Sequence, residues 1–119
     1  MAVSLLKVAQ YALFSDDLRL DLLVEAFLRE NPVLSIVARP DTNDHRTLAV
    51  AASLIELFAS RSNQEPPGWT KAIGPIQRPF FLQSDAMESP WLRELCVKEA
   101  PAPLRKRNLY ATANFLLTA

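Results

Sequence analysis

Proline and glycine are spread unevenly along this chain of 119 residues, and their distribution limits where long helices can form. Seven of the nine prolines and both glycines lie after Glu65. Proline lacks a backbone N–H and its ring clashes with the preceding helical turn, so helix interiors exclude it. The sequence therefore predicts long helices before residue 65 and an irregular, punctuated path after it.

The first 65 residues carry helical patterns. Apolar residues recur at three- and four-residue spacings over 3–14, 16–30 and 44–61, and in the last of these they are expected to hold one face. Ser15 is expected to cap the second helix, and Asn43 or Asp44 the third. The apolar residues 32–38 suit a short strand or a helical turn, and the helical interpretation is preferred. These helices predict a small antiparallel bundle.

The segment "NQEPPGWTKAIGPIQRPFFLQSDAMESP" follows this bundle, and it combines prolines with aromatic residues. Leaving Trp69, Phe80 and Phe81 in water would forgo roughly 1.5 to 3 kcal/mol for each side chain. We therefore expect an arm docked on the bundle rather than a flexible linker. Ser89 and Pro90 then predict the N-cap and first position of a helix over "WLRELCVKEA", which Pro101 ends.

The chain is long enough for one core, because half of its residues are hydrophobic. The expected fold is mainly α and forms a single domain over 1–119. Residues 1–65 form the helical bundle, and residues 66–119 form the Pro/aromatic-rich arm and a short C-terminal helical region packed on it. The sequence shows no apolar run of about 18 to 20 residues and no secretory signal, so we expect a cytoplasmic protein without a membrane partner.

Side chains for catalysis or metal binding are scarce. His45 is the only histidine and Cys96 the only cysteine, whereas zinc sites draw on several such ligands. With only two glycines, the chain has neither common phosphate-binding loop pattern. Cys96 lies between Leu95 and Val97 in a helical pattern and is expected to be a buried small hydrophobe. We therefore expect no cofactor, no metal and no enzymatic activity.

The charged residues are balanced overall, with 13 basic and 13 acidic side chains. A protein whose whole surface attracts nucleic acid or lipid is therefore excluded. Three cationic residues nevertheless stand together near the C-terminus, and we call Arg105, Lys106 and Arg107 the basic cluster. It could stabilise the fold, bind a protein partner, or contact phosphates while Tyr110 and Phe115 stack on bases.

The structural interpretation of the basic cluster is preferred. Residues two apart do not share a helix face, so Arg105 and Arg107 should point in different directions. One of them is expected to form an internal pair, most plausibly with Glu94 or Glu99, and the other to stay exposed.

The order of "PPGWT", "PFFL" and "SPWLRELCVKEAPAPLRKRNLYATANFL" resembles a group of small bacterial proteins. Members of this group are often encoded beside nucleotidyltransferase-like proteins of toxin–antitoxin type. The resemblance covers about residues 44–119 and implies a non-enzymatic interaction protein, the antitoxin-like partner of such a protein. The alternative is a nucleic-acid-binding regulator that uses the basic cluster with Arg46 and Arg61. The candidate partner-binding residues are Trp69, Phe80, Phe81, Trp91, Arg105, Lys106, Arg107 and Tyr110.

Overall fold

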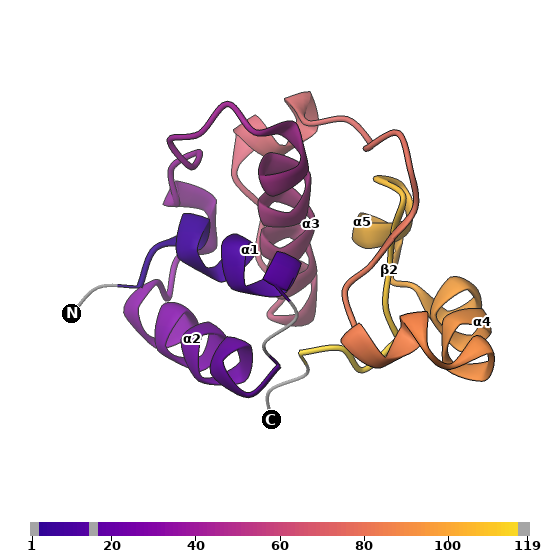
Figure 1. Ribbon diagram of the computed structural model, residues 1–119. Helices are drawn as coiled ribbons and strands as arrows, with labels where there is room; N and C mark the ends of the chain where they lie inside the picture. The colour runs from indigo at the N-terminus through magenta and orange to yellow at the C-terminus, as the bar shows by residue number, and fades with distance from the viewer. Residues whose placement is uncertain (1–2, 15–16, 117–119) are drawn as a thin grey trace.

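A computed structural model describes residues 3–14 and 17–116, and the fold is mainly helical, as predicted (Figure 1). The elements in chain order are α1 (Leu5–Phe14), α2 (Asp17–Glu30), the 3₁₀ helix η1 (Leu34–Ile36), α3 (His45–Arg61), the 3₁₀ helix η2 (Gly68–Ala72), β1 (Phe80–Phe81), the 3₁₀ helix η3 (Ser84–Met87), α4 (Pro90–Glu99), α5 (Ala102–Arg105) and β2 (Leu109–Tyr110). Among the described residues, no helix combines the length and hydropathy that a membrane crossing requires.

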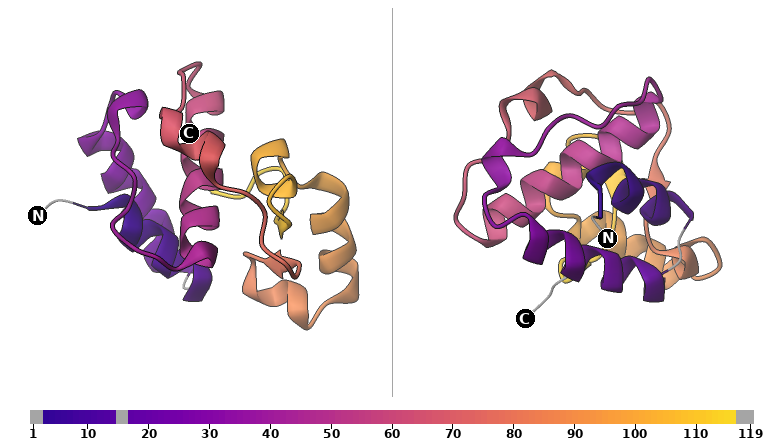
Figure 2. Two further views of the ribbon diagram at one scale, coloured as in Figure 1. Left: turned by 90° about the horizontal axis from the view of Figure 1, so that it is seen from above. Right: turned by 90° about the vertical axis from the view of Figure 1, so that its left-hand side faces the viewer.

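Helix α3 lies in the middle of the molecule. Figures 1 and 2 show α1 and α2 on one side of it and α4, α5 and β2 on the other, and α3 contacts both α1 and α5. Every residue from Thr47 to Ala59 is buried as a result. The apolar residues predicted to hold one face are buried, and the opposite face is buried as well, because the second half of the chain covers the side away from α1. A helix that is apolar almost all round is typical of this central position.

Two predicted helix caps are confirmed. The Asp44 carboxylate accepts a hydrogen bond from the backbone N–H of Thr47 at the start of α3. The Ser89 hydroxyl accepts one from the N–H of Leu92 at 3.2 Å, and Pro90 takes the first position of α4. Both caps satisfy donors that have no partner within the helix. The cap predicted at Ser15 lies outside the described residues.

The core is continuous across both halves of the chain. Helices α1, α2 and α3 supply most of its side chains, and the C-terminal residues join them. The C-terminal contributors are Leu82, Leu104, Leu109, Ala111, Phe115 and Leu116. The C-terminal segment is therefore part of the same hydrophobic core as the N-terminal helices.

A short parallel strand pair was not predicted from the sequence. Phe80 of β1 pairs with Leu109 of β2, and Phe81 pairs with Tyr110. The backbone N–H of Leu82 donates to the carbonyl of Tyr110 at 3.0 Å, which continues the pairing. Helices α4 and α5 lie between the two strands in the chain, and such a long connection is what parallel pairing needs.

Residues 32–38 form a single 3₁₀ turn, so the helical interpretation holds only for Leu34–Ile36. Val33 and Val37 on either side have extended backbones. The side-chain oxygen of Gln64 accepts from the N–H of Leu34 at 2.9 Å. The hydrogen bond to Gln64, 30 residues further along the chain, thus takes the place of the backbone hydrogen bond that Leu34 N–H would make in a longer helix.

Candidate functional site

Arg107 of the basic cluster is buried, with 1% of its surface exposed. Its Nη1 and Nη2 donate to the two carboxylate oxygens of Glu56 on α3, at 2.7 and 3.1 Å. The remaining donors reach the carbonyl oxygens of Ile73 (3.0 Å), Thr70 (2.8 Å) and Pro103 (3.2 Å). A guanidinium has five N–H groups, and this arrangement uses all of them. Arg107 therefore connects α3, η2 with the residue that follows it, and the C-terminal segment.

Glu56 is held ionised by its cationic neighbours. Its carboxylate is almost completely buried, and Lys106 Nζ lies 2.9 Å from Oε1. Burial alone would raise the pKa of Glu56, but the hydrogen bonds from Arg107 and Lys106 outweigh burial and lower this pKa to about 2. One carboxylate thus faces two cations.

The expectation that one arginine is paired internally and the other exposed is confirmed. Arg105 is exposed, and its Nη2 donates to the carbonyl oxygen of Lys98 at 3.1 Å. The predicted partner of the buried arginine was wrong, because Arg107 pairs with Glu56 and not with Glu94 or Glu99. Arg107 is also too buried to touch a partner, so its place among the candidate partner-binding residues is corrected.

Sequence reasoning missed Glu56, although the sequence carries a signal for it. Glu56 is the one charged residue in the apolar run "LAVAASLIELFA", and it lies four residues after Ala52 and three before Ala59. That spacing places it on the apolar side of the helix. Because charged residues are almost never buried unless paired, its position indicates an internal cation.

Trp69 and Phe80 make contacts within the fold. Both are partly buried against the core. Trp69 Nε1 donates to the carbonyl of Val37 at 2.9 Å, which connects η2 to the residues after η1. The guanidinium carbon of Arg46 lies 5.2 Å from the centre of the Phe80 ring, within the range of a cation–π contact.

Phe81 and Tyr110 lie together on the strand pair. Their ring centres are 5.6 Å apart with a tilt of 33°. The Tyr110 hydroxyl donates to Asn108 Oδ1 at 3.1 Å. Both rings are partly buried, so each retains some surface that a partner could reach.

Trp91 differs from the other candidates, since 71% of its surface is exposed. It lies in the first turn of α4, the helix at the outer edge of the molecule in Figure 1. Glu94 and Lys98 are three and seven residues further along the helix, and Val97 flanks Glu94; all three are exposed. We call Trp91, Glu94, Val97 and Lys98 the α4 surface.

Cys96 and His45 make contacts within the fold. Cys96 is buried, as predicted, and its Sγ donates to Gln83 Oε1 at 3.3 Å. Burial, followed by the charge of Glu99, raises the pKa of the Cys96 thiol. His45 is exposed, and its Nε2 lies 3.0 Å from the carbonyl oxygen of Pro75. In the described part of the chain, no three His, Cys, Asp or Glu side chains form a group suited to a metal ion.

No protein-family model, curated protein or solved structure matches this sequence.

Proposed function

We propose that this chain is a non-enzymatic interaction protein that binds a protein partner through the α4 surface. The observation that carries the proposal is the exposed Trp91. Tryptophan combines a large apolar area with one polar N–H, and it is enriched among the residues that dominate protein–protein affinity. The indole of Trp91 is mostly in water, so a partner that buried its apolar surface would gain free energy from that burial.

The charges around Trp91 favour a protein partner over nucleic acid. Glu94 lies on the same face as Trp91, and Asp85 and Glu88 are exposed shortly before α4. These carboxylates would repel phosphates, whereas Lys98 supplies a charge of the opposite sign. A mixed polar rim around an apolar centre is the usual composition of a protein interface.

The resemblance in the C-terminal half suggests the identity of the partner. It implies a nucleotidyltransferase-like protein encoded beside this chain, with the present protein in the antitoxin role. In this proposal α1, α2 and α3 act as an antiparallel bundle, and residues 66–89 act as an arm across it. The arm would hold α4 in place, and the hydrogen bond between Cys96 and Gln83 supports that arrangement.

The test is a calorimetric titration of the purified protein with the nucleotidyltransferase-like protein encoded beside it. Trp91→Ala should weaken binding by about 2 kcal/mol, roughly 30-fold, as for an interface anchor. Phe14→Ala is the control, because Phe14 on α1 is an aromatic residue of similar exposure, 79%. Equal losses in both variants would contradict the α4 surface, and no binding by the parent would contradict the proposed partner.

Within the basic cluster, the nucleic-acid alternative, which also uses Arg46 and Arg61, would depend on Arg105 and Lys106, since Arg107 is buried. Two phosphate contacts from the cluster alone would make log K fall with log salt with a slope of about −1.8. Binding of the parent to duplex DNA with this slope, lost in Arg105→Ala, would favour the alternative over the proposal. We expect no such salt-dependent binding.

A further inference from the structure

A pocket of about 230 Å³ lies where η2 and the residues after it meet the basic cluster. We call it the lysine pocket, and its lining residues are Lys71, Ile73, Gly74, Pro75, Lys106 and Arg107. Its volume is below the range of about 300 to 1,000 Å³ for the sites of drug-sized ligands. The pocket therefore suits a small chemical group.

Hydrogen bonds fix one wall of the lysine pocket. Arg107 Nε donates to the carbonyl oxygen of Ile73 at 3.0 Å, and the N–H of Ile76 donates to the carbonyl oxygen of Arg107 at 3.1 Å. His45 Nε2 lies 3.0 Å from the carbonyl oxygen of Pro75. These contacts hold the wall in place without a ligand, which lowers the entropy that binding would cost.

Positive charge is in excess around the lysine pocket. Residues 66–84 and 100–116, which supply its walls, contain no Asp or Glu. Glu56 carries one negative charge but contacts two cations of the basic cluster, and Lys71 adds a third cation to the wall. Three cations against one carboxylate leave two positive charges in excess. A dianion would balance them.

Two lysines offer donors that a ligand can reach. Lys71 is exposed, and its ammonium group has no hydrogen-bond or ion-pair partner within residues 3–14 and 17–116. The ammonium group of Lys106 has three N–H groups. One contact of this group goes to Glu56 Oε1, and 56% of the Lys106 side chain is exposed. The donors of Arg107 are all used within the fold, so recognition of an anion depends on the two lysines.

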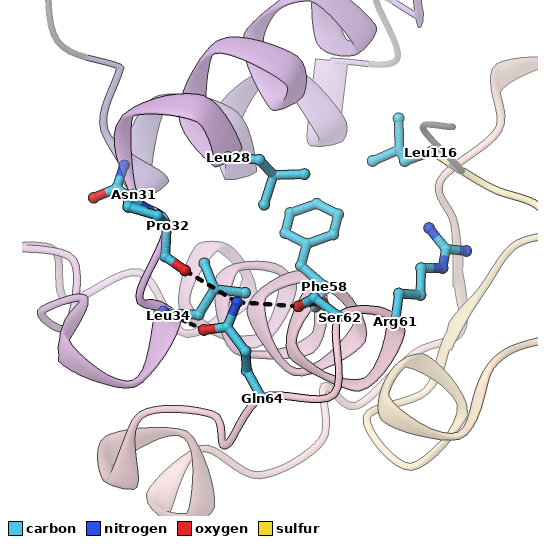
Figure 3. A pocket seen from close by; sticks show the side chains of 9 residues that line it. All are labelled: Leu28, Asn31, Pro32, Leu34, Phe58, Arg61, Ser62, Gln64 and Leu116. Atoms are coloured by element: carbon cyan, nitrogen blue, oxygen red, sulfur yellow. Dashed lines mark hydrogen bonds between the residues drawn. The ribbon is translucent and has the colours of Figure 1, made fainter.

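The pocket between α2, η1 and the end of α3 differs in this respect (Figure 3). The side chain of Gln64 accepts from the N–H of Leu34 at 2.9 Å and donates to the carbonyl of Pro32 at 3.0 Å, as the dashed lines show. Nη1 of Arg61 is buried, so a ligand in that pocket cannot reach it. The lysine pocket, by contrast, has cationic donors that are open to solvent.

We propose that the lysine pocket binds a dianionic phosphate group, either as free phosphate or as a small phosphate monoester. The phosphate oxygens would accept charge-assisted hydrogen bonds from Nζ of Lys71 and Nζ of Lys106. A carboxylate would bring only one negative charge. Each phosphodiester of a nucleic-acid backbone also carries one charge and is flanked by two sugars, so it suits a small pocket less well. The lysine pocket shares no residue with the α4 surface, so this inference stands independently of the proposed function.

The test is an NMR titration of the full chain with inorganic phosphate and with methyl phosphate, at about pH 8, where both are mainly dianions. We expect saturable shifts of the backbone amide signals of Lys71, Gly74 and Lys106. The dissociation constant should be on the order of 1 mM, because each of two charge-assisted hydrogen bonds contributes roughly 30-fold. Binding of both ligands would support a site that accepts esters, and binding of phosphate alone would support a site for the free ion.

Three results of this titration would overturn the proposal. The first is the absence of saturation below about 50 mM phosphate, since a site of the expected affinity would be full at that concentration. The second is an equal response to chloride, which would show an adventitious ion only. The third is displacement of phosphate by duplex DNA with hydroxyl ends, which would favour the nucleic-acid alternative.

Variants locate the site. Lys71→Gln should weaken phosphate binding by about tenfold or more, and Lys71 makes no contact that the fold would lose. Arg105→Gln is the matched control, because it removes an exposed cation of the basic cluster that does not line the pocket. Its effect should be no more than about twofold. Equal losses in the two variants would contradict the assignment to the lysine pocket.

A third variant keeps both lysines and changes the charge of the pocket. Gly74→Asp adds a carboxylate to the wall, and nothing lies within 4 Å of the position that its Cβ would take. The variant should therefore fold as the parent does and lose phosphate binding, because the added carboxylate repels the dianion and competes for the lysines. Undiminished binding by this variant would overturn the proposal.

Discussion

At the scale of single residues, Arg107 and Glu56 are expected to matter most for stability. Glu56→Gln removes the negative charge and leaves the guanidinium buried without a counter-ion, which should cost about 3 to 5 kcal/mol of unfolding free energy. Urea unfolding at neutral pH measures this loss. The control is Glu25→Gln, which breaks an exposed pair with Arg29 and should change stability by less than about 1 kcal/mol. Similar losses in the two variants would contradict the role of the buried pair.

The same carboxylate should make stability depend on pH. Its pKa falls from the ordinary value of 4.5 to about 2 in the folded protein. A lowered carboxylate pKa stabilises the fold above the unfolded value, and that contribution disappears as the pH falls from about 4.5 towards 2. The contribution is roughly 3 kcal/mol. Unfolding curves at neutral pH and near pH 3 should therefore show the gap between parent and Glu56→Gln closing in acid, and a constant gap would contradict the assignment.

The sequence allowed only part of this residue-level account. The two-residue spacing of Arg105 and Arg107 correctly predicts that one arginine is exposed and the other buried. The spacing is sufficient because it alone decides which sides of the backbone the two side chains take. The partner of Arg107 is 51 positions away, and periodicity carries no information about contacts at that distance. Glu56 could still have been recognised as a buried charge from its apolar neighbours.

At the scale of elements, the two tryptophans offer a matched comparison. Trp69 is partly buried and its Nε1 donates to the carbonyl of Val37, whereas Trp91 is mostly exposed. Trp69→Ala should cost about 3 kcal/mol, the lower end of the range for aromatic truncations, because some of the ring is already in water. Trp91→Ala should change stability by no more than about 0.5 kcal/mol. Thermal unfolding of both variants checks this. An equal loss of stability in the two variants would contradict the difference in burial between Trp69 and Trp91.

Helices and their caps were predictable because their signals lie within a few residues of each other. Ser89 with Pro90 marks the start of α4, and Asp44 marks the start of α3. The strand pair could not be predicted in the same way, because α4 and α5 separate Phe80 from Leu109 in the sequence and no local pattern links the two strands. The candidate site residues follow the same division. Trp91 is a candidate from its sequence motif, whereas its exposure is known only from the fold.

At the scale of the whole molecule, α3 is buried on both sides, by α1 on one and by α5 on the other. A fragment of residues 1–65 would retain α1 and α2 but would lose α5, whose contact buries the opposite face of α3. We expect this fragment to lack a cooperative unfolding transition and to bind a hydrophobic dye, because the side chains of that face would lie in water. Calorimetry and dye fluorescence of the fragment beside the full chain test this, and cooperative unfolding of the fragment would contradict it.

The long separation between Glu56 and Arg107 also has a kinetic consequence. Their contact closes a loop of 51 positions, and long loops carry an entropy cost that delays such contacts until late in folding. Glu56→Gln should therefore mainly increase the rate of unfolding and leave the rate of folding almost unchanged. Stopped-flow measurements across a range of urea concentrations separate the two rates. If Glu56→Gln instead mainly slowed folding, the ion pair would already be formed in the folding transition state. That result would contradict the late formation of the contact between Glu56 and Arg107.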